Sequence, residues 1–219
     1  MVSDAENVDW EDLAAFTYQE KNYLLIPDVG DNFADRKDYT IYVIEEPDAA
    51  VLKVDKPVSV TTAWQMVFRY EDGPHDCESV AVDEKNGKIL LASKDGAPPV
   101  LYELPLRPAG SAAPEIARRV ALITGPGLTG PSSMEWFNPT AMDISRDGKT
   151  VAILSFDRVY LFTPHKSLAW TDTMAARPRY IWLPMLRQPE ALAITPDKSA
   201  MYITSEKIPA PLYRIDLNK

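Results

Sequence analysis

Short apolar runs alternate with polar turns along the whole chain, and they do so in the same order four times. The first run of each copy follows the pattern polar-x-Glu-x-apolar-small-apolar, with Thr140 in place of Glu in the third copy. The copies occupy residues 9–16, 76–83, 138–145 and 188–195. Their starts lie 67, 62 and 50 residues apart, which is typical of an internal repeat with insertions.

Each copy continues with a polar turn and a second apolar run, and together they predict a hairpin. Asn86-Gly87 and Asp147-Gly148 are dipeptides that tolerate the positive φ of tight turns. A third run carries an apolar-Tyr pair every time, and a fourth apolar run is visible in three copies. The second runs are residues 23–26, 89–92, 151–154 and 201–204; the pairs are 41–42, 101–102, 159–160 and 212–213; the fourth runs are 61–70, 117–123 and 179–183.

Four antiparallel strands per unit predict an all-β protein, a β-propeller with four recognisable repeats in one domain over residues 1–219. The repeats cover roughly residues 9–70, 76–123, 138–183 and 188–219, and the last lacks its outer strand. A β-sandwich is the alternative, but it would not repeat its first two strands so regularly. The sequence leaves open a compact four-bladed ring or part of a larger one. An open ring would expose a strand edge suited to self-association.

The best helical candidate, residues 170–177, is short and ends before Pro178.

Composition narrows the function without defining it. The fractions of 46% hydrophobic and 25% charged residues are ordinary for a globular chain. The net charge of −9 disfavours a nucleic-acid partner and fits either a cation-binding surface or an ordinary solvated exterior. No run of 18 apolar residues occurs, so we expect no membrane span.

The compartment stays open. Residues 1–7 are acidic and lack the apolar core of a signal peptide. The protein would be cytoplasmic if Met1 is its native start, and extracytoplasmic if a leader has been removed. Cys77 is the single cysteine, so no intrachain disulfide can form, and we expect a small buried residue there.

Antiparallel pairing brings the start of each first strand beside the end of the second, so polar residues at these points should share one face near the axis. Their oxygens suit Ca²⁺, which takes six to eight oxygen ligands. We expect metal ligands among Glu11, Glu78, Glu190, Asp28 and Asp31. We expect ligand contacts from Asn32, Arg36, His75, Lys94, Asp157, Glu206 and Lys207.

Two roles remain open for the three Glu: each could contact a metal or substrate, or accept backbone N–H bonds from the next repeat as a latch. The Asp-rich loop at residues 27–36 could likewise bind a cation, or Arg36 could pair with one of its Asp. The chain lacks the Gly-x-Ser-x-Gly, Walker, His-Glu-x-x-His and dinucleotide motifs, which disfavours enzymes of those kinds.

Residues 76–83, followed by 87–94, resemble the Asp-x-Glu-Gly segment of β-propeller phytases and phytase-like esterase propellers, and residues 188–195 are similar. Residues 9–14 with Gly30-Asp31-Asn32 resemble bacterial propeller proteins that carry a Trp-Glu-Asp and Gly-Asp-Asn pair. The phytase resemblance implies that Glu11, Glu78 and Glu190 contribute to calcium sites in the channel. This chain departs from the phytase pattern at Asp12, Ser79 and Ala191, which replace Gly, at Thr140, and in having fewer than six blades.

Two functions follow from these patterns. One is a propeller that binds a small molecule or protein at the channel mouth, with a calcium site there. The alternative is a calcium-dependent propeller hydrolase acting on phosphoester or lactone-type substrates. A propeller fold hosts both classes, so the sequence leaves open whether the protein is an enzyme.

Overall fold

The structure is a computed structural model that describes residues 1–48, 50, 57–110, 112–125, 128, 137–163 and 169–217. Four successive groups of antiparallel strands correspond to the four sequence repeats. Repeat 1 holds β1 (Ala14–Tyr18), β2 (Lys21–Asp28), β3 (Tyr39–Glu45) and β4 (Trp64–Tyr70); repeat 2 holds β5 (Cys77–Asp83), β6 (Lys88–Ser93), β7 (Val100–Pro105) and β8 (Glu115–Leu122). Repeat 3 holds β9 (Ala141–Ile144), β10 (Val151–Leu154), β11 (Arg158–Phe162) and β12 (Arg179–Trp182); repeat 4 holds β13 (Pro189–Ile194), β14 (Ala200–Ser205) and β15 (Tyr213–Asp216).

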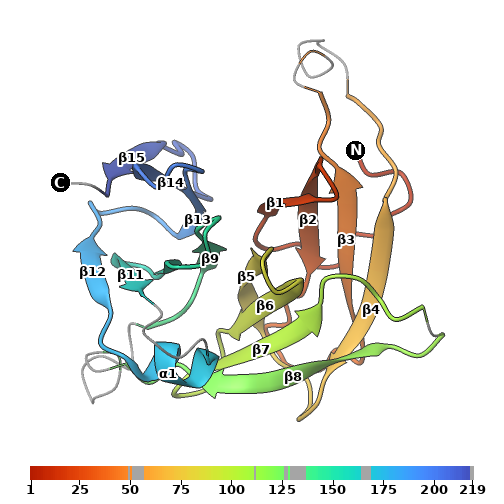
Figure 1. The fold of residues 1–219 in the computed structure, drawn as a ribbon, viewed down its shortest axis with the longest axis horizontal. Helices are drawn as coiled ribbons and strands as arrows, with labels where there is room; N and C mark the ends of the chain where they lie inside the picture. Colours follow the sequence, from red (N-terminus) through yellow and green to blue (C-terminus); the bar gives the residue numbers. More distant parts are fainter. Residues whose placement is uncertain are drawn as a thin grey trace.

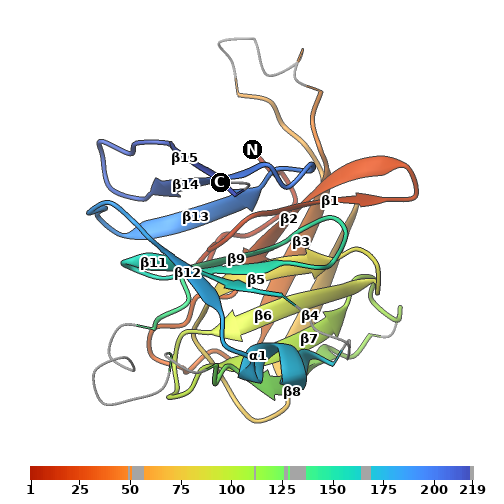
Figure 2. The same ribbon diagram turned by 60° about the vertical axis from the view of Figure 1, so that its left-hand side comes forward.

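The repeats are arranged around a common centre. Figure 1 shows the first strands β1, β5, β9 and β13 in the middle of the molecule, with the last strands β4, β8 and β12 at the periphery. Figure 2 shows the same inner strands from the side. The prediction of an all-β propeller fold is therefore confirmed.

The apolar runs that form β5, β6 and β10 become strands that are buried on both faces, whereas the outer strands β4, β8 and β12 keep exposed positions. In β10, Val151 and Ile153 pack into the core cluster shared with repeat 2, whereas Ala152 and Leu154 pack into the cluster shared with repeat 4. A strand between two neighbouring sheets has no solvent face, so its sequence is continuously apolar rather than alternating. The turn that precedes it has Gly148 at φ 67°, as the Asp-Gly dipeptide predicts.

A short helix, α1 (Trp170–Ala175), forms in the segment with helical character. Its Met174 is fully buried in the cluster between repeats 2 and 3, and Trp170 packs against that cluster. The described residues contain no helix of the length and hydropathy that a membrane crossing requires.

One sheet contact is absent from the sequence prediction. The outer strands β4 and β8 pair in parallel, with Phe68 opposite Glu115 and Tyr70 opposite Ala117. Repeats 1 and 2 therefore form one continuous eight-stranded sheet. Only the fold brings these two strands together, because no local pattern encodes a pairing between the ends of separate repeats.

Repeat 4 contains three strands within the described residues, as predicted, and β15 forms the edge of its sheet. The N-terminal segment does not supply the missing strand. Instead, Val2 pairs with Val60, and Thr62 donates hydrogen bonds to Asp4. This segment covers the outer face of repeat 1, where Val2 and Trp10 pack on a buried cluster of Ile26, Tyr42 and Ile44.

A buried carboxylate joins the inner strands of three repeats. Asp12, which is 7% exposed, accepts hydrogen bonds through Oδ2 from the backbone N–H groups of Val80 in repeat 2 and Met142 in repeat 3, both at 3.0 Å. Its Oδ1 accepts a third bond from Leu13 N at 2.8 Å. Asp143 similarly accepts a bond from Ile194 N of repeat 4 at 2.7 Å. Carboxylates therefore bridge the inner strands of adjacent repeats.

We expect Asp12→Ala to lower the free energy of unfolding by about 3 kcal/mol, because two buried N–H groups lose their acceptor. Asp12→Asn should lose less, since one carbonyl oxygen in the place of Oδ2 can accept both inter-repeat bonds. Chemical denaturation followed by fluorescence measures the difference. Asp38→Ala, which removes an ion pair to a half-exposed Arg69, serves as a control and should lose under about 1 kcal/mol. Equal losses for Asp12→Ala and Asp38→Ala would contradict the bridging role.

Candidate functional site

Three backbone segments meet at one end of the inner strands of repeats 1 and 2. Residues 9–11 lead into β1 and lie against the loop after β2, with Glu11 N donating to Pro27 O at 3.1 Å and Gly30 N to Asp9 O at 3.2 Å. The same loop contacts the start of β5, because Asp31 N donates to Asp76 Oδ1 at 2.9 Å. This is the convergence expected from antiparallel pairing. We call the carboxyl groups of Asp9, Glu11, Asp76, Glu78 and Glu190 the acidic mouth.

Gly30 lets two of these carboxylates approach each other. A Cβ atom at this position would lie 2.5 Å from Asp9 Oδ2 and 2.5 Å from Glu11 Oε1. Both oxygens therefore lie against the side of Gly30 on which any other residue would carry its side chain. The two carboxylates come from the segment before β1, and the loop after β2 provides the space between them.

Glu78 contributes a buried oxygen that has no partner. The residue is 8% exposed, and its Oε1 pairs with the ammonium of Lys94, which follows β6. Its Oε2 is buried and accepts no hydrogen bond from any described residue. Burial raises the pKa of Glu78, and the Lys94 ammonium opposes that shift. An unpartnered buried carboxylate oxygen is costly to the fold, so it marks a place where a positively charged group would be stabilised.

The carboxylates of the acidic mouth interact strongly enough to change their protonation. Burial, and then the charges of Glu78, Asp9, Asp76 and Glu190, raise the pKa of Glu11 to about 8. Burial followed by the charges of Glu206 and Glu78 also raises the pKa of Glu190. Five carboxyl groups thus act on one region, and the ammonium groups of Lys94 and Lys207 oppose the shift at Glu190.

Asp28 and Asp31 lie in the same region, but the fold occupies their oxygens. Asp28 accepts bonds from Val8 N and Asp9 N and forms an ion pair of 2.8 Å with Arg36. Asp31 accepts bonds from Asp35 N at 3.1 Å, Arg36 N at 3.0 Å and the Tyr39 hydroxyl at 2.7 Å. Burial acts to raise the pKa of Asp31, but these bonds keep it below the usual value. We therefore leave Asp28, Asp31 and Arg36 out of the candidate ligand set.

The other polar residues singled out in the sequence have local partners or face solvent. Asp157 pairs with Arg158 at 2.6 Å, and Glu206 pairs with Lys207 at 2.7 Å. Asn32 is exposed. Thr140 is buried, and its hydroxyl donates to Pro189 O at 2.6 Å, which links repeat 3 to the start of β13.

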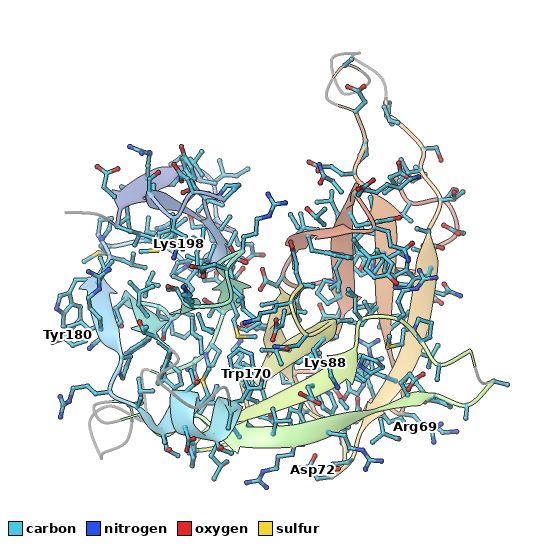
Figure 3. All side chains as sticks on the ribbon, viewed as in Figure 1. Arg69, Asp72, Lys88, Trp170, Tyr180 and Lys198 are labelled. Carbon is cyan, nitrogen blue, oxygen red and sulfur yellow. The ribbon has the colours of Figure 1, made fainter. Side chains whose placement is uncertain are left out.

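His75 belongs to a separate network. Its Nδ1 lies 2.9 Å from Asp95 Oδ2, and its Nε2 lies 3.1 Å from Asp72 Oδ1 and 2.8 Å from the Tyr102 hydroxyl. Figure 3 shows Asp72 at the outer rim of the molecule. Hydrogen bonds from His75 to Asp95 and Asp72 raise the pKa of the imidazole against the effect of burial. Both ring nitrogens are thus engaged away from the acidic mouth.

The latch role left open for the Glu residues belongs to other positions. Among the described residues, no backbone N–H donates to the side chain of Glu11, Glu78 or Glu190, whereas Asp12 and Asp143 accept such bonds. Sequence reasoning also missed Asp9 and Asp76 as members of the mouth. The signal was present, because both stand two residues before a repeated Glu.

Cys77 is fully buried, and burial raises the pKa of its thiol to about 12. The thiol is therefore protonated at neutral pH and unsuited to act as a nucleophile.

The described residues contain no ready-made group of three His, Cys, Asp or Glu side chains positioned for a metal ion. The donor set of the mouth nevertheless consists of oxygens, which are the ligands that Ca²⁺ prefers. Asp9 and Glu11 each place one carboxylate oxygen against Gly30, and Glu78 offers a buried free oxygen. These residues fit a hard cation, whose other ligands would be water.

Comparisons with known proteins identify no family for this chain. No family model matches the chain, and no curated protein matches it. Its structure is similar to the periplasmic gluconolactonase PpgL of Pseudomonas aeruginosa, with 11% identity, a TM-score of 0.49, and coverage of 98% of this chain and 59% of that one. It is also similar to hydrazine synthase of Kuenenia stuttgartiensis (12% identity, TM-score 0.47, 99% and 49% coverage). A third similar structure is the Cps50 (Swd1) β-propeller domain of Myceliophteria thermophila, with 9% identity, a TM-score of 0.47, and coverage of 95% of this chain and 54% of that one.

The chain thus spans about half the length of the structures that it matches. At these identities and TM-scores, the matches say nothing about its ligand or reaction.

The raised pKa of Glu11 predicts that stability falls as the pH rises through neutrality. The folded pKa of about 8 lies above the ordinary value of 4.5. Between these values the folded protein holds a proton that the unfolded chain has lost, so raising the pH favours unfolding. We expect the Tm to decrease from pH 6 to pH 8.5, and Glu11→Gln to reduce that decrease. Differential scanning calorimetry over this range measures both slopes.

The control is Glu45→Gln, which removes a carboxylate that is 57% exposed and should leave the slope unchanged. If wild type and Glu11→Gln lose stability with pH at the same rate, Glu11 does not titrate in this window.

Proposed function

We propose that this propeller is a binding protein that holds a cation in the acidic mouth, and that Ca²⁺ is the metal suited to it. The observation that carries the proposal is the free Oε2 of Glu78, a buried carboxylate oxygen without a hydrogen-bond donor in a cluster of carboxylates. A cation beside it would replace the missing partner. It would also offset the repulsion that raises the pKa of Glu11.

The ligands would be Glu11, Asp9 and Glu78, with Glu190 and Asp76 near enough to add charge. A bound Ca²⁺ would order these side chains and give the mouth a positive centre that attracts an oxygen-bearing ligand. Lys94 remains the partner of Glu78 Oε1, which orients that carboxylate and favours its ionised form against the effect of burial. The function supported best is therefore recognition of a ligand at the mouth.

Adding Ca²⁺ should raise the Tm, because an ion that binds only the folded state stabilises it. We expect a concentration-dependent shift of several degrees in thermal scans, smaller with Mg²⁺, and at least a tenfold loss of Ca²⁺ affinity in Glu78→Gln and Glu11→Gln by calorimetry. Gly30→Ala should also weaken binding, since its Cβ would lie 2.5 Å from an oxygen of Asp9 and of Glu11 and would force both carboxylates to move. Glu45→Gln is the matched control. Equal Ca²⁺ affinity in Glu78→Gln and Glu45→Gln would sink the proposal.

A hydrolase is the second candidate, and the pKa of Glu11 favours it. A carboxyl group with a pKa of about 8 can take up and release a proton near neutral pH, as general acid–base catalysis requires. The metal would supply polarisation of a substrate oxygen or a more acidic water. Substrates of the phosphoester or lactone type offer such an oxygen.

Turnover of aryl esters, aryl phosphates and a small lactone, each with Ca²⁺ and with EDTA, tests this candidate. As an enzyme, the wild type should turn over at least one substrate, and Glu11→Gln should lower kcat by about a hundredfold or more. Activity that persists in Glu11→Gln comes from a contaminant or another site. If none of these substrates is turned over and Ca²⁺ still binds, the hydrolase candidate fails and the binding function is retained.

A further inference from the structure

A groove runs from the acidic mouth along the two inner strands that face each other across the open side of the molecule. Between repeats 1 and 4 lies a hollow of about 330 Å³, bordered by Glu11 and Leu13 on one side and by Glu190 and Leu192 on the other. A second hollow of about 470 Å³ continues past Leu13 and Leu192 toward Glu84. Figure 1 shows β1 and β13, the two inner strands that border these hollows.

The walls of the groove near the mouth are apolar and only partly covered. Leu13 is 54% exposed, Leu212 is 68% exposed and Tyr202 is 37% exposed, and all three line the first hollow. Ala191 and Ala193 add small apolar surface between them. Large apolar side chains gathered on both sides of one groove favour an apolar occupant, because it would remove their surface from water.

The end of the groove holds the carboxyl groups of Glu11 and Glu190, neither of which has a basic side chain of the described part of the chain as its direct partner, although the charges of Lys94 and Lys207 act on Glu190 from nearby. Lys94 pairs with Glu78, and Lys207 pairs with Glu206. No ion pair joins Glu11 or Glu190 to a basic side chain anywhere in the described ranges, which extend from residue 1 to residue 217 with gaps. An occupant of this groove is therefore favoured if its apolar body ends in a positive charge.

We propose that the groove binds a small amphiphilic cation, with an ammonium group between Glu11 and Glu190 and an apolar chain or ring along Leu13, Tyr202 and Leu212. The inference rests on the proposed cation-binding function of the acidic mouth and adds the chemical class of the ligand. An ammonium donates hydrogen bonds to carboxylates, as Lys94 already does to Glu78. A bound ammonium and Ca²⁺ share Glu11 and exclude each other.

The experiment is a calorimetric titration with ethyl-, butyl- and hexylammonium, with hexanoate and hexanol as matched controls. Affinity should rise by about three- to fourfold for each methylene that becomes buried, and hexanoate should bind at least tenfold more weakly than hexylammonium. Leu13→Asn and Leu212→Asn should abolish the dependence on chain length. Met185→Asn, an exposed residue outside the groove, should retain it. Glu190→Gln should weaken hexylammonium by about tenfold.

The outcomes separate this inference from the function on which it rests. If Ca²⁺ shifts the Tm but the affinity for the alkylammonium ions does not change with chain length, the mouth binds cations and the groove is not part of its ligand site. If neither Ca²⁺ nor any amine binds, the cation-binding function itself fails. If hexanoate binds as well as hexylammonium, or Glu190→Gln has no effect, the charge assignment is overturned. A dimer that dissociates in Leu13→Asn, seen by sedimentation, would mean that a second copy fills the groove.

Leu13→Asn and Leu212→Asn should keep the Ca²⁺ response of the wild type, because neither residue supplies an oxygen to the mouth. Loss of that response together with a normal unfolding transition would show that the groove and the mouth are one inseparable site. It would overturn the assignment of the ammonium group to the mouth and of the apolar chain to the groove.

Discussion

The buried carboxylate of Asp12 fixes the distances between the inner strands on which the acidic mouth depends. Its Oδ2 is bonded to backbone N–H groups of two other repeats, so the segments that carry Glu11 and Glu78 cannot separate without breaking those bonds. Three buried clusters between successive repeats maintain the same spacing farther out. The carboxyl groups at the mouth are therefore held close together against their mutual repulsion.

The acidic side chains near the axis fall into two groups that differ in how their charge is compensated. Asp12, Asp28 and Asp31 accept bonds from backbone N–H groups. In Asp12 these bonds oppose the effect of burial, which still raises its pKa to about 8. The Oε2 of Glu78 is buried and accepts no bond from the described residues, and burial with neighbouring carboxylates raises the pKa of Glu11. The first group maintains the fold. The second retains an uncompensated demand for positive charge, which is the physical basis for assigning cation binding to it.

The sequence predicted the repeats because strand formation depends on local alternation and turn residues, which are visible without the structure. It placed Glu11 and Glu78 correctly at the starts of first strands, since the antiparallel hairpin determines that position. It could not distinguish Glu11 from Asp12, because both lie in the segment before β1 and only the packing decides which side chain meets the next repeat. Gly30 and the parallel pairing of β4 with β8 escaped prediction for the same reason: both depend on contacts between distant segments.

The groove and the acidic mouth share the same segments of the chain. Glu11 and Leu13 precede β1, Glu190 and Leu192 lie in β13, and all four border the hollow between repeats 1 and 4. The N-terminal segment packs on the outer face of repeat 1, and Leu13 and Leu212 keep more than half of their surface exposed beside the mouth. Carboxyl groups and apolar walls therefore stand within one hollow, and a ligand that satisfies both would bind across the open side between repeats 1 and 4.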